Sequence, residues 1–518
     1  MSLSPLDIVV LVGYFCLTIG IGLWFARKNT STEEYFVGGR RFRGWVIGLS
    51  LVGTSISSIT FLAYPADAFK TAWLRYLPNL MLPISVLIAA YLFLPFFRRR
   101  QTISAYEYLE ERFGPSVRVY GAIAFIVAQL SRLAMILWLL SLLVQEVTGL
   151  TPGYAIMLCG VIVGAYTIVG GIDAVIWTDV LQTIVLLVGG IVCLWVIVDM
   201  LPGGLTQIID TASAAGKLSF SEWQNGEPTP MRWDLSLTSK TGTMMLFIGL
   251  TAWLTEYSSN QNTVQRYCAS ASTKEARRGM LVCVLASLPI WAFYMFLGTA
   301  LWVLFQHQPD ETANAILNGS EKAEKILPWF ISEYLPNGIA GLVIAAALAA
   351  AMSSLDSSIN SVTAVSIVDL YRRHLKPEQT DQHYLRAAWM VAGGVTMLMI
   401  GGAWWLENTD TKTLQDTSTI LVSLLSGGLL GLYLLGFLTR QGDARAAWFG
   451  IAGTMLFTGW TLLSHRGLLP EALQVPFDLY YTGLIGNLTM FVLGYVLARL
   501  LPRRNVLAAD LTLARTTS

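Results

Sequence analysis

The sequence predicts an all-α integral membrane protein, and three observations lead to this fold class. Of the 518 residues, 54% are hydrophobic and only 13% are charged, a balance typical of polytopic membrane proteins rather than of soluble domains. Hydropathy predicts thirteen transmembrane helices along the chain. Two of these helices are interrupted by polar residues, which is typical of folds in which a five-helix unit is repeated with inverted topology.

The predicted helices divide the chain into a repeated core with additions at both ends. We expect an extra N-terminal helix and cytoplasmic loop over residues 1–43, the first five-helix repeat over 44–200, an outer loop over 201–237, the second repeat over 238–440 with an outer loop at 307–337, and two extra C-terminal helices with a short cytoplasmic tail over 441–518. Most of the 34 Lys and Arg residues then lie on one side of the membrane, which predicts an N-terminus outside and a C-terminus in the cytoplasm.

The two polar breaks lie in corresponding helices of the predicted repeats. In helix 44–68, the residues from Gly53 to Ser58 are small and polar, and Pro65 follows them. Helix 238–260 ends in a polar run after Glu256. Backbone oxygens freed at such breaks are typical binding groups for ions and solutes, whereas the alternative interpretation is a kink or a packing face of small residues.

The stretch 345–361 is the strongest candidate for a binding function. It lies within a long hydrophobic segment, yet it contains Ser353, Ser354 and Ser357 together with Asp356. Hydroxyl, carbonyl and carboxylate oxygens are the ligands that a small hard cation prefers. The alternative is a helix–helix seam in which the serines bond to their own backbone. The aspartate disfavours this alternative, because an intramembrane carboxylate without a partner costs roughly 3 kcal/mol or more.

Arg132 is the second unusual residue, because it lies in the middle of the apolar helix 117–147. It is too far from either end for its charge to reach the membrane surface. A guanidinium binds a carboxylate through two parallel hydrogen bonds, which indicates an anionic ligand. The alternative is a structural ion pair with Asp179, Glu256 or Asp356.

Other features narrow the function without defining it. Asp179 follows the Gly170–Gly171 turn and is interpreted either as a cation ligand or as a group that caps a helix start. The sequence contains no nucleophile, P-loop or zinc-protease motif, so we expect no enzyme activity. The net charge of +1 excludes a strong electrostatic attraction to nucleic acid.

Several motifs together resemble the sodium:solute symporter family. They are Ser104–Phe113 (SAYEYLEERF), YTIVGGIDAVIWTDVLQ at 166–182, NQNTVQRY at 260–267 and AAMSSLDSSINS at 350–361. Within this family, the chain is most similar to bacterial sodium-coupled sialic acid transporters, through SSITF at 57–61, VIWTD at 175–179 and Arg132. The resemblance covers nearly the whole chain and implies a LeuT-like core.

The resemblance also implies positions for ions and solute. It places a first sodium ion at the backbone carbonyls and side-chain hydroxyls of Gly53, Ile56, Ala350, Ser353 and Ser354. It places a second sodium ion at Asp179, Ser353, Asp356 and Ser357. The implied solute site consists of Ser55, Ser57, Thr60, Asn79 and Arg132, with Arg132 binding a sugar carboxylate.

Asp356 departs from the family pattern, which has a hydroxyl at this position. If Asp356 faces Asp179, two acids surround one pocket, and both remain ionised only when a cation lies between them. This predicts either a second sodium ion or a shared proton. Ser353 and Ser357 favour sodium because they add neutral oxygens.

The leading functional prediction is a sodium-coupled symporter of the inner (cell) membrane. We expect it to import sialic acid (N-acetylneuraminate) or a related anionic sugar acid, together with one or two sodium ions, and to act as a monomer in the lipid bilayer. One alternative is another solute on the same fold: a monocarboxylate, a neutral sugar, a vitamin or an inorganic anion. A second alternative is a membrane sensor with a transporter-like domain.

Overall fold

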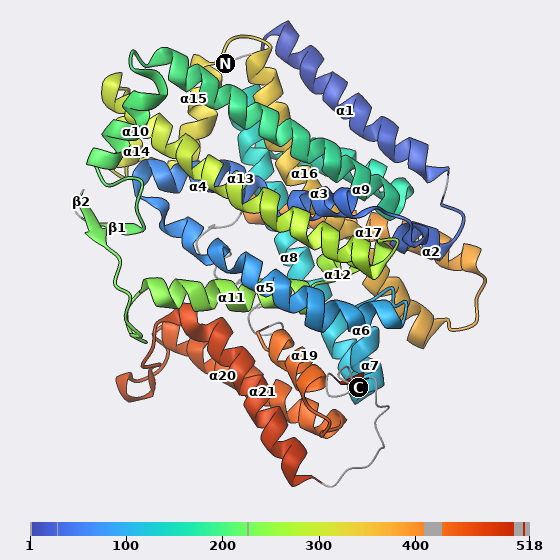
Figure 1. Ribbon diagram of the computed structural model, residues 1–518. Coiled ribbons are helices and arrows are strands. Elements are labelled where there is room, and N and C mark those ends of the chain that lie inside the picture. The colour runs from blue at the N-terminus through green and yellow to red at the C-terminus, as the bar shows by residue number, and fades with distance from the viewer. Residues whose placement is uncertain (1–2, 28, 225–226, 409–426, 502–510, 513–518) are drawn as a thin grey trace.

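The computed structural model is a bundle of long helices (Figure 1). It describes residues 3–27, 29–224, 227–408, 427–501 and 511–512. Within these residues, nine helices are long and apolar enough to cross a membrane, or ten when one bent pair is included. The predicted helix around 412–440 is described only as α19 (Leu429–Leu438), and its first part lies outside the described residues. The count of thirteen helices therefore stays a prediction.

The first half of the chain begins with peripheral helices and then enters the core. Its elements are α1 (Pro5–Ala26), α2 (Thr32–Val37), η1 (Gly38–Arg40), α3 (Gly44–Ser55), α4 (Ser58–Lys70), η2 (Trp73–Met81), α5 (Leu82–Ile88), η3 (Ala89–Phe93), α6 (Leu94–Arg99), α7 (Glu107–Phe113), α8 (Pro115–Thr148), α9 (Pro152–Met200) and α10 (Gly204–Ala214).

The second half of the chain contains the remaining helices. Its described elements are α11 (Gly242–Ser259), α12 (Gln261–Ala269), α13 (Thr273–His307), α14 (Glu311–Leu317), η4 (Ala323–Lys325), α15 (Ile326–Tyr334), α16 (Ile339–Val365), η5 (Ser366–Leu375), α17 (Asp381–Glu407), α19, α20 (Ala444–His465), η6 (Glu471–Leu473), η7 (Leu479–Tyr481) and α21 (Thr482–Leu500). A small antiparallel hairpin, β1 (Ser221–Gln224) and β2 (Glu227–Pro230), departs from the all-α prediction and lies in the outer loop.

Helix α9 spans two membrane crossings, which the sequence predicts as two separate helices. At 49 residues it would be about 73 Å long if straight, more than twice the thickness of a hydrocarbon core. Gly171 interrupts it with φ 60° and ψ −161°, a conformation that side chains rarely adopt. The chain therefore bends at the glycine turn expected from the sequence.

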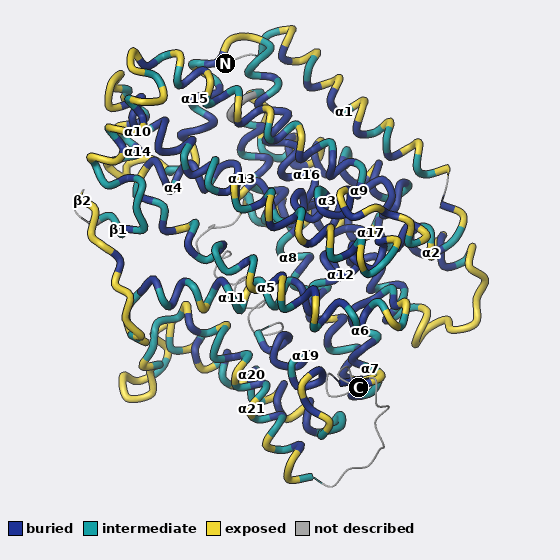
Figure 2. The backbone as a smooth tube through the Cα atoms, viewed as in Figure 1, coloured by how far each residue is buried: buried dark blue, intermediate teal, exposed yellow. Residues whose placement is uncertain are grey.

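Helix α16 forms the centre of the bundle. In its most apolar window 89% of the residues are buried, compared with 22% in α1. Figure 2 shows the same contrast, with α16 and its neighbours dark and α1 at one edge of the bundle. Helix α16 packs against α9, α8 and the α3–α4 pair. Its small residues, which form the motif at 345–361, allow these helices to approach closely.

The outer loop is attached to α4 by a buried lysine. The ammonium group of Lys217 donates to the carbonyl oxygens of Phe69 (2.7 Å) and Thr71 (2.8 Å) at the end of α4. It also lies 4.3 Å from the ring centre of Trp223 and 4.9 Å from that of Trp302. Burial lowers the pKa of Lys217 to about 7. The β hairpin and the outer end of the broken helix are thus held together.

Candidate functional site

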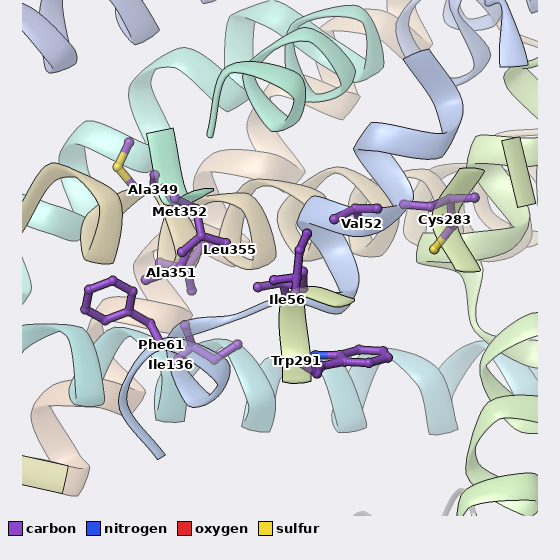
Figure 3. Packing of buried hydrophobic residues seen from close by; sticks show 14 of the residues in the cluster. Val52, Ile56, Phe61, Ile136, Cys283, Trp291, Ala349, Ala351, Met352 and Leu355 are labelled. Atoms are coloured by element: carbon purple, nitrogen blue, oxygen red, sulfur yellow. The ribbon is translucent and has the colours of Figure 1, made fainter. Parts of the chain in front are cut away.

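The site is organised by the break between α3 and α4, which are bent by 58° relative to each other. Ile56 and Ser57, between the two helices, have extended backbone conformations. Because a helix end leaves its last carbonyl groups without helical donors, the last turn of α3 has oxygen atoms available for other partners. Figure 3 shows Ile56 and Phe61 of this segment together with Leu355 of α16 and Ile136 of α8.

The break and α16 bring together three of the five groups predicted for the first sodium ion. The hydroxyl of Ser353 donates to the carbonyl oxygens of Gly53 (2.9 Å) and Ala350 (3.1 Å). The hydroxyl of Ser354 is buried and has no hydrogen-bond partner among the residues that the structure describes. Ile56 is buried at the break itself. Neutral carbonyl and hydroxyl oxygens in this arrangement suit a small hard cation, so these residues fit sodium.

The groups predicted for the second sodium ion are arranged differently from the expectation. Asp179 and Ser357 are bridged by a guanidinium group, because Nη2 of Arg266 lies 2.8 Å from Asp179 Oδ2 and 2.5 Å from Ser357 Oγ. Asp179 also accepts a hydrogen bond from Ser50. In this conformation an internal cation lies between two of the four predicted ligands.

Arg266 is a residue whose place the sequence analysis did not predict. It was not among the predicted site residues, yet α12, which contains it, is buried throughout its length. Its side chain is 1% exposed and also bonds to Ser50 Oγ and to the carbonyl oxygen of Asn262. Hydropathy misses such a helix because the helix is polar yet enclosed by protein. A signal was present, since Asn260, where α11 ends, forms the second polar break with extended backbone.

Asp356 does not share its bonding partners with Asp179. Its Oδ2 atom accepts from the hydroxyls of Tyr166 (2.8 Å) and Thr178 (3.2 Å), both on α9. Its Oδ1 atom accepts from Ser357 (3.3 Å). The carboxylate is fully buried, and it forms no ion pair with any described residue. Tyr166 and Thr178 were not identified from the sequence as functional residues.

The predicted solute residues lie on the segments around the broken helix. Ser55 ends α3, Ser57 is the N-cap of α4, and Thr60 is buried in the first turn of α4. Asn79 is buried in η2, and its amide donates to the hydroxyl of Tyr64 (2.6 Å). Helix α4 contacts both η2 and α8. Among the described parts of the chain, the hydrogen bond between these four residues is the backbone one from the N–H of Thr60 to the carbonyl oxygen of Ser57 (2.9 Å), and no side-chain bond joins them.

Arg132, the fifth predicted solute residue, has no structural ion pair within the part of the chain that the structure describes. It is half-buried on α8. The three carboxylates that could have paired with it have other partners: Asp179 binds Arg266, Asp356 binds hydroxyls, and Glu256 accepts from Asn260 and Thr263. Ile136, one helical turn further along α8, packs near Phe61 of α4.

A membrane-spanning bundle with a broken helix and a hard-ion cradle at the break defines a secondary transporter of the inverted-repeat, LeuT-like class. A model described as the sodium:solute symporter family matches residues 35–453. The chain therefore belongs to the sodium:solute symporter family, and it is a membrane transporter rather than an enzyme.

Individual relatives support the same assignment. The chain is 31% identical over 508 residues to the sodium/sialic acid symporter SiaT of Proteus mirabilis, covering 98% of this chain and 97% of the relative. It is 30% identical to the sodium/sialic acid symporter NanT of Aliivibrio fischeri, with 96% and 94% covered. A solved substrate-bound, outward-open Na⁺-coupled sialic acid symporter superposes with a TM-score of 0.86 at 29% identity, with 97% and 100% covered. The predictions of family, fold class and sodium coupling are confirmed.

Proposed function

We propose that this protein imports an anionic sugar acid of the sialic acid type, driven by one or two sodium ions moving inward through the cell membrane. The first sodium ion binds the carbonyl oxygens of Gly53, Ile56 and Ala350 and the hydroxyls of Ser353 and Ser354. Each sodium ion supplies its concentration gradient and about 2.3 kcal/mol per 100 mV of membrane potential. In the proposed topology the N-terminus is outside, the C-terminus is cytoplasmic and the monomer is the transporting unit.

One observation carries the solute assignment: the guanidinium of Arg132. It lies half-buried in the middle of a membrane-spanning helix and forms no hydrogen bond or ion pair with another described residue. A charge in this place costs roughly 3 kcal/mol or more when it is unpaired. A solute carboxylate would remove this cost through two parallel hydrogen bonds. Ser55, Ser57, Thr60 and Asn79 would then bind the hydroxyl and amide groups of the sugar.

The experiment is uptake of labelled N-acetylneuraminate into proteoliposomes with an inward sodium gradient. We expect uptake that requires sodium, exceeds the equilibrium level and increases with an inside-negative potential. Unlabelled N-acetylneuraminate should compete fully, whereas lactate, glucose and iodide should not. Competition by lactate alone would assign the site to a monocarboxylate and contradict the sugar acid. Equal uptake in potassium would contradict sodium coupling.

A further inference from the structure

Helices α3 and α13 begin side by side, at a junction that is distant in sequence. The segments before them run in parallel, because the backbone of Phe42 accepts a hydrogen bond from Ala271 (2.9 Å) and donates one to Ala269 (3.3 Å). The two helices then pack along each other. At Gly44 an added Cβ atom would lie 2.8 Å from the Cβ atom of Arg278. The first turn of α3 therefore lies against the second turn of α13.

Three cations at this junction form a group that we call the basic patch: Arg43, Lys274 and Arg278. All three are exposed, and their side chains form no hydrogen bond or ion pair with another described residue. The neighbouring Arg277 differs, because it donates to the carbonyl oxygen of Ala90 (3.0 Å). The carboxylate of Glu275 accepts a hydrogen bond from the backbone of Gly44 instead. The described part of the chain thus leaves the three charges unneutralised.

An apolar stripe on the same face of α13 distinguishes a lipid from a free anion as the partner of the basic patch. Leu281 and Leu285 follow Lys274 and Arg278 at intervals of three or four residues, so the four side chains share one face. The leucines are 56% and 65% exposed. Trp45, at the start of α3, is 41% exposed, which is typical of the membrane–water interface. The face thus has cations at the interface and exposed leucines up to about 10 Å deeper.

We propose that the basic patch binds the phosphate group of an anionic phospholipid, whose acyl chains lie along Leu281 and Leu285. Phosphate oxygens accept charge-assisted hydrogen bonds from arginine, and they neutralise the unpaired cations. The proposed topology places this end of both helices at the cytoplasmic surface, where anionic lipids attract basic residues. The bound lipid holds the start of α3 against α13, and the other end of α3 supplies Gly53 to the first sodium site.

The test measures the melting temperature of purified, delipidated full-length protein in a neutral detergent, titrated with dioleoylphosphatidylglycerol. A ligand of the folded protein raises the melting temperature, so the titration gives the lipid concentration for half-maximal stabilisation. We expect little stabilisation by dioleoylphosphatidylcholine, which has no net charge, or by inorganic phosphate, which has no acyl chains. Sodium and solute are left out, so the result does not depend on the proposed function.

The variant Arg43→Gln/Arg278→Gln should need a roughly 30-fold higher concentration of phosphatidylglycerol, because it removes two of the three cations. The control Arg372→Gln/Lys376→Gln removes two exposed cations at the end of η5 and should match wild type. If the first variant does not fold, Lys274→Gln decides alone, with an expected change of about fivefold. Equal half-maximal concentrations in wild type and the patch variants would overturn this site. Equal stabilisation by phosphatidylcholine or inorganic phosphate would also overturn it.

Discussion

Two arginines in the membrane core, Arg266 and Arg132, have opposite environments. Arg266 is 1% exposed and bonds to Ser50, Asp179, Asn262 and Ser357. Arg132 is half-buried and has no bond or ion pair to any other described residue. One guanidinium is therefore part of the protein framework, and the other is available to a ligand.

The comparison teaches that an intramembrane charge indicates a function only after its partners are known. Removing one member of a buried ion pair leaves an uncompensated charge, which is strongly destabilising. Removing a charge that is paired only by a ligand does not destabilise the free protein. It destabilises only the complex with the ligand. Changes at Arg266 should therefore lower the stability of the fold, whereas changes at Arg132 should lower the affinity for the ligand.

The largest expected effect is on stability at Arg266. Arg266→Met leaves Asp179 buried without its counter-charge, and should destabilise the fold by roughly 3–5 kcal/mol. The loss should appear as a lower melting temperature and a lower yield of monodisperse protein. Arg266→Met/Asp179→Asn should recover part of the stability because it removes the unpaired charge. An Arg266→Met protein that melts like wild type would show that the pair is not structural.

At Arg132 we expect loss of affinity without loss of stability. A charge-assisted pair is worth about 1.5–3 kcal/mol, so Arg132→Ala should weaken binding of N-acetylneuraminate by roughly 10- to 150-fold. Arg132→Lys should recover little, because a point charge does not reproduce two parallel bonds. The melting temperature without solute should be equal to or higher than that of wild type, because the variant lacks the unpaired charge. A large drop there would make Arg132 a framework residue like Arg266.

A smaller effect is expected at the first sodium site, where no fixed charge is involved. Ser354→Ala removes one neutral oxygen ligand, and should raise the sodium concentration for half-maximal uptake by several-fold to tenfold. The matched control on the same helix is Thr363→Val, whose hydroxyl bonds to the carbonyl oxygen of Ile359. An unchanged sodium dependence in Ser354→Ala, or an equal change in the control, would remove Ser354 from the site.

The smallest effect concerns Lys217, a third buried cation, which lies in the outer loop. Its pKa is lowered from 10.5 to about 7 by burial. Between these values the unfolded chain binds a proton that the folded protein does not, so stability rises with pH. Melting temperatures at pH 7, 8 and 9 should rise by a few degrees more in wild type than in Lys217→Met. Parallel changes in the two proteins would contradict the lowered pKa.

The sequence predicted the parts of the fold and site that depend on local patterns. The polar break at Gly53–Ser58 appears between α3 and α4, and the small residues of α16 lie at the centre of the bundle. Ser353 contacts Gly53 across 300 residues of sequence. The break and the small-residue helix follow because such features are encoded within a few turns, whereas the contact between Ser353 and Gly53 was implied only by the resemblance to the family.

The remaining features depend on which distant groups meet, and a single sequence does not encode this in any local pattern. Arg266 was not predicted as a site residue, because α12 is polar and gives no hydropathy signal, although every residue of α12 is buried. Whether Asp356 faces Asp179 was left open by the sequence, and the hydrogen bonds that its carboxylate accepts from Tyr166 and Thr178 of α9 became visible only in the structure.

The central claim, that Arg132 binds the carboxylate of the solute, is tested most directly by a cycle of two changes measured by calorimetry in saturating sodium. One change is Arg132→Ala, and the other replaces N-acetylneuraminate by its methyl ester, which lacks the charge. We expect each change alone to weaken binding strongly, and the ester to bind wild type and Arg132→Ala about equally, giving a coupling energy of roughly 1.5–3 kcal/mol. Additive losses, with no coupling, would contradict the claim.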